Sequence, residues 1–400
     1  MNSLIPVASF RPWIRSLAIV VVVAMAVGGS LTLAQSTSHA AASAGIGFQV
    51  PQLVVRAGTS NVIYVLYSAT CGGTRCYRLT RSANGGQTFA KVTAPPISSE
   101  YTNASSVTGS LDQLVFANPE DGYATENFWG TQSTLYATFD GAHSWHQEHI
   151  KGAEFIQSLT SSPTAFYVIT EHCDPRHTTC TNLQLARTPL QRSAWTSTPV
   201  PENVLRGGTP SFGLQVAAYG SKTWILEQAK YPPQRLATST NGGKSFSIKP
   251  EPGLTGAATC QLTATSMTSL WATCAQGNEL SELLYSDDGG VHWNGTSEYS
   301  KGTVGRLLSF GSFDPISRDV AYATDGFDTT ATQTIYQVTG SSDAFRVVGS
   351  LPTSKYLYDL TFTNSKQGLA YAFVGQGAAH PLWSTDNGGR SWRQVPVPTT

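Results

Sequence analysis

The sequence has 400 residues, of which 12% are charged, and 25 Lys and Arg residues balance 25 Asp and Glu residues. A typical domain carries about 25% charged residues, so this chain has few charges. Because its positive and negative charges balance, it lacks the net positive charge that attracts nucleic acid or an anionic membrane surface. It contains 37 Gly and 21 Pro residues. These residue types favour tight turns, so the composition favours a β protein with many short strands.

Residues 1–45 have the pattern of an export signal. Two arginines precede an apolar run at 17–27, and residues 38–41 are similar to a signal-peptidase cleavage site. The apolar run has 11 residues, whereas a membrane-spanning helix needs about 20. A cleaved signal peptide is therefore favoured, and a run extended to Ala34 keeps an N-terminal membrane anchor as the alternative. In both cases the sequence predicts that residues 46–400 are secreted or extracytoplasmic.

One pattern recurs along residues 46–400. It consists of Ser or Thr, then Asn or Asp two residues later, a small residue at the fourth following position and an aromatic residue at the seventh. Five copies fit this pattern, and two worn copies lie at 188–195 and 338–345, inside two gaps of double length. The pattern residues of the five copies are Ser82, Asn84, Gly86 and Phe89; Thr138, Asp140 and Trp145; Ser239, Asn241, Gly243 and Phe246; Ser286, Asp288, Gly290 and Trp293; and Thr385, Asn387, Gly389 and Trp392.

The spacing of the aromatic residues predicts the number of repeats. They fall at positions 89, 145, 195, 246, 293, 345 and 392, so each unit is close to 50 residues long. Four short strands with their turns require a unit of about that length. Runs of alternating and β-branched residues, interrupted by Gly and Pro, indicate strands and leave no room for amphipathic helices. We therefore expect an all-β, seven-bladed propeller over residues 46–400.

The residue types of the repeat suit a hairpin turn. A short Asn or Asp side chain can accept hydrogen bonds from nearby backbone N–H groups, and glycine adopts a positive φ without a Cβ clash. The aromatic residue that follows can bury its ring against the blade. We therefore expect structural and not catalytic roles for the repeat residues.

The repeats resemble the Asp-box, or BNR, repeats of sialidase-like propellers, sortilin-type receptors, some glycoside hydrolases and photosystem II assembly factors. The resemblance covers residues 48–400, and the G-G-x-T/S-W pattern is most similar to the photosystem II assembly-factor group. It implies that the repeat turns join the third and fourth strands of each blade, on the face opposite the ligand site. Function does not follow from such a fold alone, because common folds host unrelated activities.

Six cysteines suit an oxidising compartment. Proximity in the sequence predicts three local pairs, Cys71–Cys76, Cys173–Cys180 and Cys260–Cys274. The first two pairs would each span a hairpin loop, and the third would join two neighbouring strands. Metal binding is the alternative, but the sequence contains no C-x-x-C motif.

Aromatic and charged residues gather in the segments that the resemblance places on the ligand face. A rim of such residues is typical of a recognition surface. We therefore expect an unidentified protein or glycan ligand, with no cofactor, no nucleic acid and no membrane contact beyond a possible anchor. The candidate binding residues are Glu126, Phe128, Trp129, His172, Asp174, Arg176, His177, Tyr231 and Arg235 in loops, and Arg206, Tyr299 and Arg306 in connections between blades.

A sialidase-like glycoside hydrolase is the alternative function. Such a site needs three arginines to hold a carboxylate, which Arg206, Arg235 and Arg306 could supply, with Tyr299 as nucleophile and Glu298 beside it. No spacing selects these residues, however, and the Arg-x-Pro element of that family is missing from the mature chain. Sialidases also have six blades. A noncatalytic binding propeller is favoured, and a surface scaffold without a small ligand is a third possibility.

Overall fold

The computed structural model describes residues 50–71, 74–97, 101–102, 106–107, 110–127, 132–173, 180–201, 211–229, 235–250, 259–276, 279–297, 310–325, 332–340, 344–352, 357–372 and 381–396. Contacts between residues group Gly47–Thr400 into one compact unit, apart from Met1–Ile46. The expected export signal at 1–45 thus lies outside the described residues. Within the described ranges, no helix has the length and hydropathy needed to cross a bilayer.

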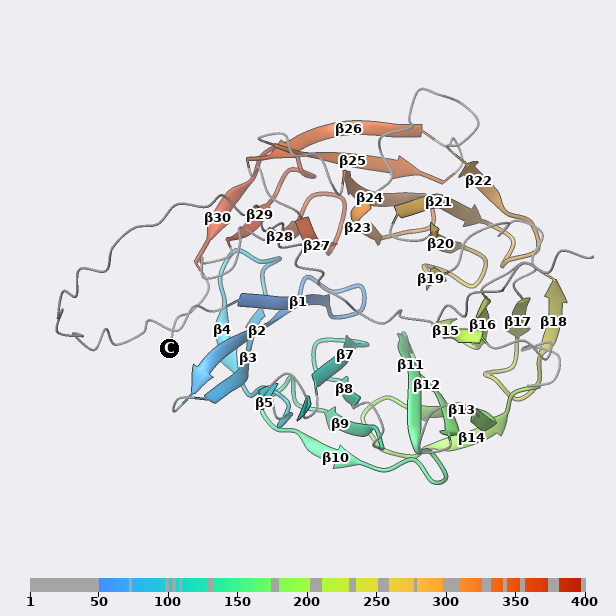
Figure 1. The fold of residues 1–400 in the computed structure, drawn as a ribbon. Coiled ribbons are helices and arrows are strands. Elements are labelled where there is room, and N and C mark those ends of the chain that lie inside the picture. Colours follow the sequence, from blue (N-terminus) through green and yellow to red (C-terminus); the bar gives the residue numbers. More distant parts are fainter. Residues whose placement is uncertain are drawn as a thin grey trace, which may run out of the picture. The chain divides into compact units, whose positions relative to one another are not determined.

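Seven sheets, each of four consecutive antiparallel strands, form the blades of a β-propeller (Figure 1). We number the blades in chain order. Blade 1 contains β1 (Val50–Arg56), β2 (Ile63–Cys71), β3 (Thr74–Ser82) and β4 (Ala90–Val92); blade 2 contains β7 (Ser110–Phe116), β8 (Gly122–Asn127), β9 (Thr134–Thr138) and β10 (His146–Glu148); blade 3 contains β11 (Phe155–Ser162), β12 (Ala165–Cys173), β13 (Cys180–Pro189) and β14 (Thr196–Pro199).

The remaining four blades repeat this order. Blade 4 contains β15 (Ser211–Tyr219), β16 (Lys222–Ala229), β17 (Arg235–Ser239) and β18 (Ser247–Pro250); blade 5 contains β19 (Thr259–Ala264), β20 (Leu270–Gln276), β21 (Glu279–Ser286) and β22 (Asn294–Ser297); blade 6 contains β23 (Phe310–Pro315), β24 (Val320–Asp325), β25 (Gln333–Thr339) and β26 (Ala344–Leu351); blade 7 contains β27 (Leu357–Phe362), β28 (Gly368–Ala372), β29 (Leu382–Thr385) and β30 (Arg393–Val395). In chain order, a short hairpin of β5 (Tyr101–Thr102) and β6 (Ser106–Val107) lies between blades 1 and 2.

The worn repeats at 188–195 and 338–345 lie in complete blades. Blade 3 and blade 6 each have four paired strands, so the predicted count of seven blades is confirmed. In blade 3 the Thr188 hydroxyl still accepts a hydrogen bond from the Ala194 N–H at 3.0 Å. In blade 6 hydrophobic packing stabilises this region in place of the turn hydrogen bond, because Val338 and Phe345 pack into the cluster between blades 5 and 6. Packing therefore preserves the blade where the turn pattern has been lost.

The apolar core is divided among the interfaces between blades. Seven hydrophobic clusters of described residues each join two successive blades. Between blades 3 and 4, for example, Ile169 and Leu185 pack with Val216 and Ile225. The second strand of each blade contributes to the clusters on both of its sides, which explains its nearly continuous apolar sequence. Burial between blades is therefore what stabilises the ring.

The ring closes between the first and the last blade without an exchange of strands. All four strands of blade 1 come from the N-terminal end, all four of blade 7 come from the C-terminal end, and β1 contacts β27. Arg56 Nη1 donates to the Phe362 carbonyl at 2.8 Å, and Asn364 Nδ2 donates to Asn61 Oδ1 at 3.0 Å. Side-chain contacts thus hold the two ends of the propeller together.

Two of the three predicted disulfides are confirmed. Cys71 and Cys76 are bonded across the β2–β3 loop, and Cys260 is bonded to Cys274 on the neighbouring strand. Cys173 and Cys180 are direct partners in the β12–β13 ladder, but their side chains are outside the described part of the chain. The third bond therefore stays a prediction.

Candidate functional site

The repeat turns occupy one face of the propeller, which we call the turn face. In the first turn the Ser82 hydroxyl accepts from the Gly86 N–H at 2.8 Å, and Asn84 Oδ1 accepts from the Thr88 N–H at 3.0 Å. The Gly85 N–H donates to the Asn61 carbonyl in the first hairpin of the same blade at 2.9 Å. The same three bonds recur in the turns that begin at Thr138, Ser239, Ser286 and Thr385.

The opposite face, which we call the loop face, carries the loops between second and third strands and the connections between blades. This follows from the antiparallel order of the strands, because alternate turns lie at opposite ends of a sheet. Three of the predicted binding residues are described, and all three lie at this end: Glu126 in β8, His172 near the end of β12 and Arg235 at the start of β17. The other nine lie outside the described residues: Phe128, Trp129, Asp174, Arg176, His177, Arg206, Tyr231, Tyr299 and Arg306.

Two buried carboxyl groups continue the core between blades 3 and 4 towards the loop face. On β12, Glu171 follows Ile169 on the same side of the strand and is 1% exposed. On β16, Glu227 follows Ile225 in the same way and is 2% exposed. Both isoleucines belong to the cluster between these blades. The loop-face end of this interface is therefore polar, while its centre is apolar.

Hydrogen bonds fix the acidic groups of blade 3. Gln157 Nε2, on β11, donates to the Glu171 carboxylate. On the neighbouring residue, His172 Nδ1 lies 2.6 Å from Glu154 Oε2, and these two side chains are 54% and 38% exposed. Buried charge is stable only when it is paired or hydrogen-bonded. Blade 3 thus presents one buried acid with an amide partner and one exposed acid with an imidazole partner.

Blade 4 contributes a cation to the same end of the interface. The β16–β17 ladder ends with Leu226 paired to Leu236, and Glu227 and Arg235 are the next residues of the two strands at its loop-face end. Arg235 is also two residues before Ala237, which lies in the cluster between blades 3 and 4. His172 lies, like Val168, on the other side of β12, which packs into the cluster between blades 2 and 3, so His172 and Arg235 lie at neighbouring interfaces of the loop face. Glu126 lies on blade 2 and is not part of this group.

The candidate functional site is the polar end of the interface between blades 3 and 4, together with the His172–Glu154 pair on the other side of β12. Its described residues offer carboxylates, an imidazole and a guanidinium, which can bind a polar ligand through charge-assisted hydrogen bonds. Among the described residues, no three His, Cys, Asp or Glu side chains come close enough to hold a metal ion. The members of the candidate site are Glu154, Gln157, Glu171, His172, Glu227 and Arg235.

Glu171 is one of the site members that the sequence analysis did not select, as are Glu154 and Gln157. The irregularity in the β12–β13 ladder adds its extra residue to β13, between Thr181 and Gln184, so Glu171 keeps the alternation of β12 and lies on the buried side with Ile169. Its spacing of two from Ile169 is the signal that could have identified it as a buried acid.

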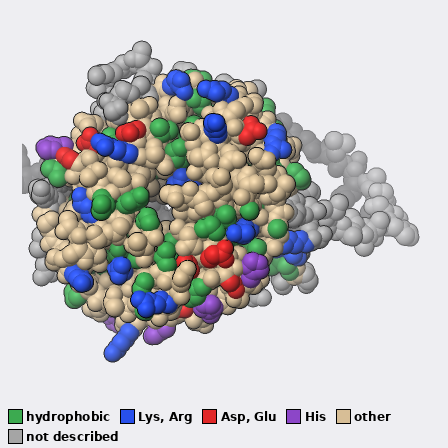
Figure 2. Space-filling model, turned by 180° about the vertical axis from the view of Figure 1, so that it is seen from behind, with side chains coloured by type: hydrophobic (Ala, Val, Ile, Leu, Met, Phe, Trp, Pro, Cys, Tyr) green, Lys and Arg blue, Asp and Glu red, His purple; other side chains and the backbone are tan. Residues whose placement is uncertain are grey.

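Charged groups are spread around the propeller face seen in Figure 2. Lys and Arg side chains lie apart from one another along its rim, interspersed with Asp, Glu and His. The described Lys and Arg side chains on this face therefore form no single continuous basic field of the kind that binds nucleic acid.

The sequence matches no protein-family model and no curated protein. Among solved structures, the chain is similar to a prolyl endopeptidase at 12% identity and a TM-score of 0.57, over 88% of this chain and 51% of that one. It is similar to the β-propeller domain of the Trilobed protease from Pyrococcus furiosus, described as having an open velcro topology, at 8% identity and a TM-score of 0.53, over 87% and 97% of the two chains.

A third similarity is to YCF48 from Cyanidioschyzon merolae, with 15% identity and a TM-score of 0.47, over 70% of this chain and 82% of that one. The chain spans about half the length of the prolyl endopeptidase. At these identities the similarities to the prolyl endopeptidase and to the Trilobed protease domain establish the propeller fold alone.

Proposed function

We propose that the chain is an exported, noncatalytic propeller with Asp-box turns, which binds a protein or glycan ligand on its loop face. The observation that carries the proposal is the different use of polar side chains on the two faces. On the turn face, the short polar residues of the repeats accept hydrogen bonds from their own backbone, as Asn84 and Ser82 do. On the loop face, the His172–Glu154 pair is partly exposed at the edge of a polar interface.

The cysteines support export. Disulfides persist in oxidising compartments outside the cytoplasm, and Cys71–Cys76 and Cys260–Cys274 are both bonded. The N-terminal arginines and the apolar run at 17–27 are the sequence signal for this route. N-terminal sequencing of the mature protein tests the prediction: a start near residues 41–46 indicates a cleaved signal, and a start at residue 1 or 2 indicates an anchor or no export.

The binding face is tested with two variants of the exported full chain. Trp129→Ala removes a ring that the sequence places at a loop tip, so we expect weaker ligand binding with little change in melting temperature. Asn387→Ala removes the acceptor for the Ser391 N–H at 3.0 Å. We expect it to lower the free energy of unfolding by about 1–2 kcal/mol and to leave affinity unchanged.

The experiment begins with immobilised wild-type protein, which is probed with extracytoplasmic proteins of the producing organism and with a glycan array. Each hit is then purified and titrated against both variants. Loss of binding by Asn387→Ala at full stability, with unchanged binding by Trp129→Ala, would contradict the face assignment. Turnover of a fluorogenic sialoside by the wild type would instead favour the glycoside hydrolase alternative.

A further inference from the structure

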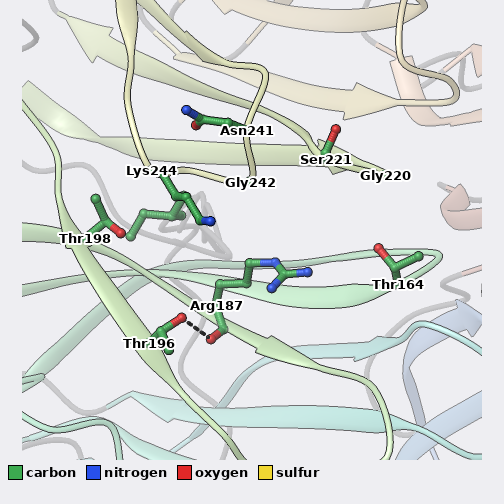
Figure 3. A pocket seen from close by; sticks show the side chains of 10 residues that line it. Thr164, Arg187, Thr196, Thr198, Gly220, Ser221, Asn241, Gly242 and Lys244 are labelled. Atoms are coloured by element: carbon green, nitrogen blue, oxygen red, sulfur yellow. Dashed lines mark hydrogen bonds between the residues drawn. The ribbon is translucent and has the colours of Figure 1, made fainter.

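A pocket of about 410 Å³ lies on the turn face between blades 3 and 4. Arg187 of β13 and Lys244 of the blade 4 repeat turn both line it, and Figure 3 shows their cationic ends directed into the same space. Side chains with hydroxyl groups complete the lining, including Thr164, Thr198 and Ser221. No Asp or Glu is among the described residues that line the pocket. Its charge is therefore positive.

Arg81 in blade 1 occupies the position equivalent to that of Arg187 in blade 3, so the surroundings of the two arginines can be compared. In blade 1, Arg81 precedes the first repeat residue as Arg187 precedes Thr188 in blade 3. Each arginine donates from Nε to the tyrosine hydroxyl of its own second strand, Arg81 to Tyr64 at 3.2 Å and Arg187 to Tyr167 at 3.3 Å. The two guanidinium groups therefore begin from the same anchored position.

The surroundings of these two arginines differ in charge: the repeat turn beside Arg81 has Asp140 and His143 where the pocket has Asn241 and Lys244, and a second difference lies in the first hairpin turn of the next blade. In blade 2, the Glu120 carbonyl accepts from the Gly141 N–H at 2.9 Å, and in blade 4 the Ser221 carbonyl accepts from the Gly242 N–H at 2.7 Å. Glu120 and Ser221 thus occupy the same turn position. The Glu120 carboxylate lies 3.7 Å from the Arg81 guanidinium. Ser221 has no carboxylate, so Arg187 lacks the acidic partner that Glu120 provides for Arg81.

The interface between blades 3 and 4 thus has an uncompensated charge. Neither Arg187 nor Lys244 forms a salt bridge within the described ranges of the chain. The Thr196 hydroxyl is occupied, because it donates to the Arg187 carbonyl at 3.3 Å, but Thr198 and Ser221 make no side-chain hydrogen bond to another described residue. An anion in the pocket would accept from two cations and these hydroxyls.

We propose that this pocket binds a dianionic oxyanion group of the phosphate or sulfate type. Two cations match two negative charges, and the planar guanidinium of Arg187 can donate two parallel hydrogen bonds to such a group. Lys244 contributes a point charge from the exposed side. Because this face is open to solvent, the interaction is screened by salt, and affinity falls as ionic strength rises. The site is independent of ligand binding on the loop face.

The test is calorimetric titration of the exported full chain with inorganic phosphate, inorganic sulfate and acetate at constant ionic strength. Lys244→Gln removes one cation from an exposed position, and we expect phosphate and sulfate affinity to fall about tenfold. Ser221→Glu restores the carboxylate found at Glu120 and fills the pocket, so binding should be lost.

Thermal unfolding of each variant shows that it is folded before it is titrated. Retention of phosphate and sulfate binding by folded Ser221→Glu and Lys244→Gln would overturn the pocket as the site. Absence of phosphate and sulfate binding by the wild type would overturn the proposal outright. Acetate binding as tight as that of phosphate would overturn the preference for a dianion.

Discussion

The Tyr64 hydroxyl donates to the Pro119 carbonyl at 2.7 Å, across the interface between blades 1 and 2. The same kind of bond recurs around the ring, because the residue after the ladder partner of the first repeat residue is aromatic in the second strand of six blades. Four further side chains reach a carbonyl of the next blade: Tyr167 to Gly220, Trp224 to Gly289, Trp271 to Ser317 and Tyr322 to Ser365. Tyr123 instead contacts the Ser193 hydroxyl, and blade 7 has Leu369.

Removing one of these donors should weaken the ring. Tyr64→Phe keeps the buried ring but deletes the hydroxyl, which leaves the Pro119 carbonyl without this donor and also removes the acceptor for Arg81 Nε. We expect the free energy of unfolding to fall by about 1–2 kcal/mol. Denaturant unfolding of the two proteins measures the difference. An unchanged midpoint would show that water replaces the bond without loss.

The same substitution should change the response to alkaline pH. Burial raises the pKa of Tyr64 to about 12, and the Arg81 hydrogen bond and charge only partly oppose it. Because the unfolded chain loses this proton near pH 10, stability should decline as pH rises from about 10 to about 12. Tyr64→Phe should make that decline shallower. If the stability of Tyr64→Phe falls with pH as steeply as that of the wild type, the raised pKa of Tyr64 is contradicted.

Two separate features favour glycine at position 86, in the first repeat turn. Gly86 has a φ of 85°, and a Cβ there would lie 2.5 Å from Leu369 Cδ2 in blade 7. Gly152 has a φ of 78° but meets no atom within 4 Å. We expect Gly152→Ala to cost about 1 kcal/mol from backbone strain alone, and Gly86→Ala to cost about 2–4 kcal/mol because it adds a clash where the ring closes. Equal melting temperatures for the two variants would contradict the tight contact with Leu369.

The sequence predicts most of the fold because its local chemistry is repetitive. Gly86 and Asn84 mark a turn that only a few residue types can form, so each copy locates a blade even without a neighbouring strand. The closure of the ring is different, since Asn61 and Asn364 meet although they are 303 residues apart. No local pattern encodes that contact.

The candidate site and the oxyanion pocket are less predictable from the sequence, because both depend on contacts between neighbouring blades. The burial of Glu171 depends on the neighbouring blade, because its side of β12 packs against blade 4. The charge around Arg187 becomes apparent only when Ser221 is superposed on Glu120 through their turn hydrogen bonds. Most predicted loop residues, including Trp129 and Arg206, lie outside the described ranges, so their roles stay predictions.

Asp140 should make the second repeat turn sensitive to acid. Burial alone would raise the pKa of this carboxyl, but hydrogen bonds from Ser144, Thr138 and His143 outweigh it and lower the pKa to about 2. The bonded carboxylate therefore stabilises the fold above its ordinary pKa, and this contribution is lost as pH falls from about 4 to about 2. Asp140→Asn, which copies the residue of other turns, should reduce the acid-induced drop in melting temperature. A larger drop in the variant would contradict this account.

The third disulfide can be tested by peptide mapping without reduction. The register of β12 and β13 sets Cys173 directly opposite Cys180, and disulfides require Cα atoms within about 7 Å. We expect one peptide pair that contains this bond, together with the pairs for Cys71–Cys76 and Cys260–Cys274. Recovery of Cys173 joined to any other cysteine would refute the pairing.

The central claim is that the loop face binds the ligand, and two matched histidines test it most directly. His172 Nδ1 lies 2.6 Å from Glu154 Oε2 on the loop face, and His292 Nδ1 lies 2.6 Å from Asp288 Oδ2 on the turn face. Both side chains are exposed, at 54% and 84%, so alanine at either position should change stability little. The measurement is the dissociation constant of the purified ligand for His172→Ala and His292→Ala. We predict that His172→Ala weakens binding at least about tenfold while His292→Ala matches the wild type, and the reverse result would contradict the account.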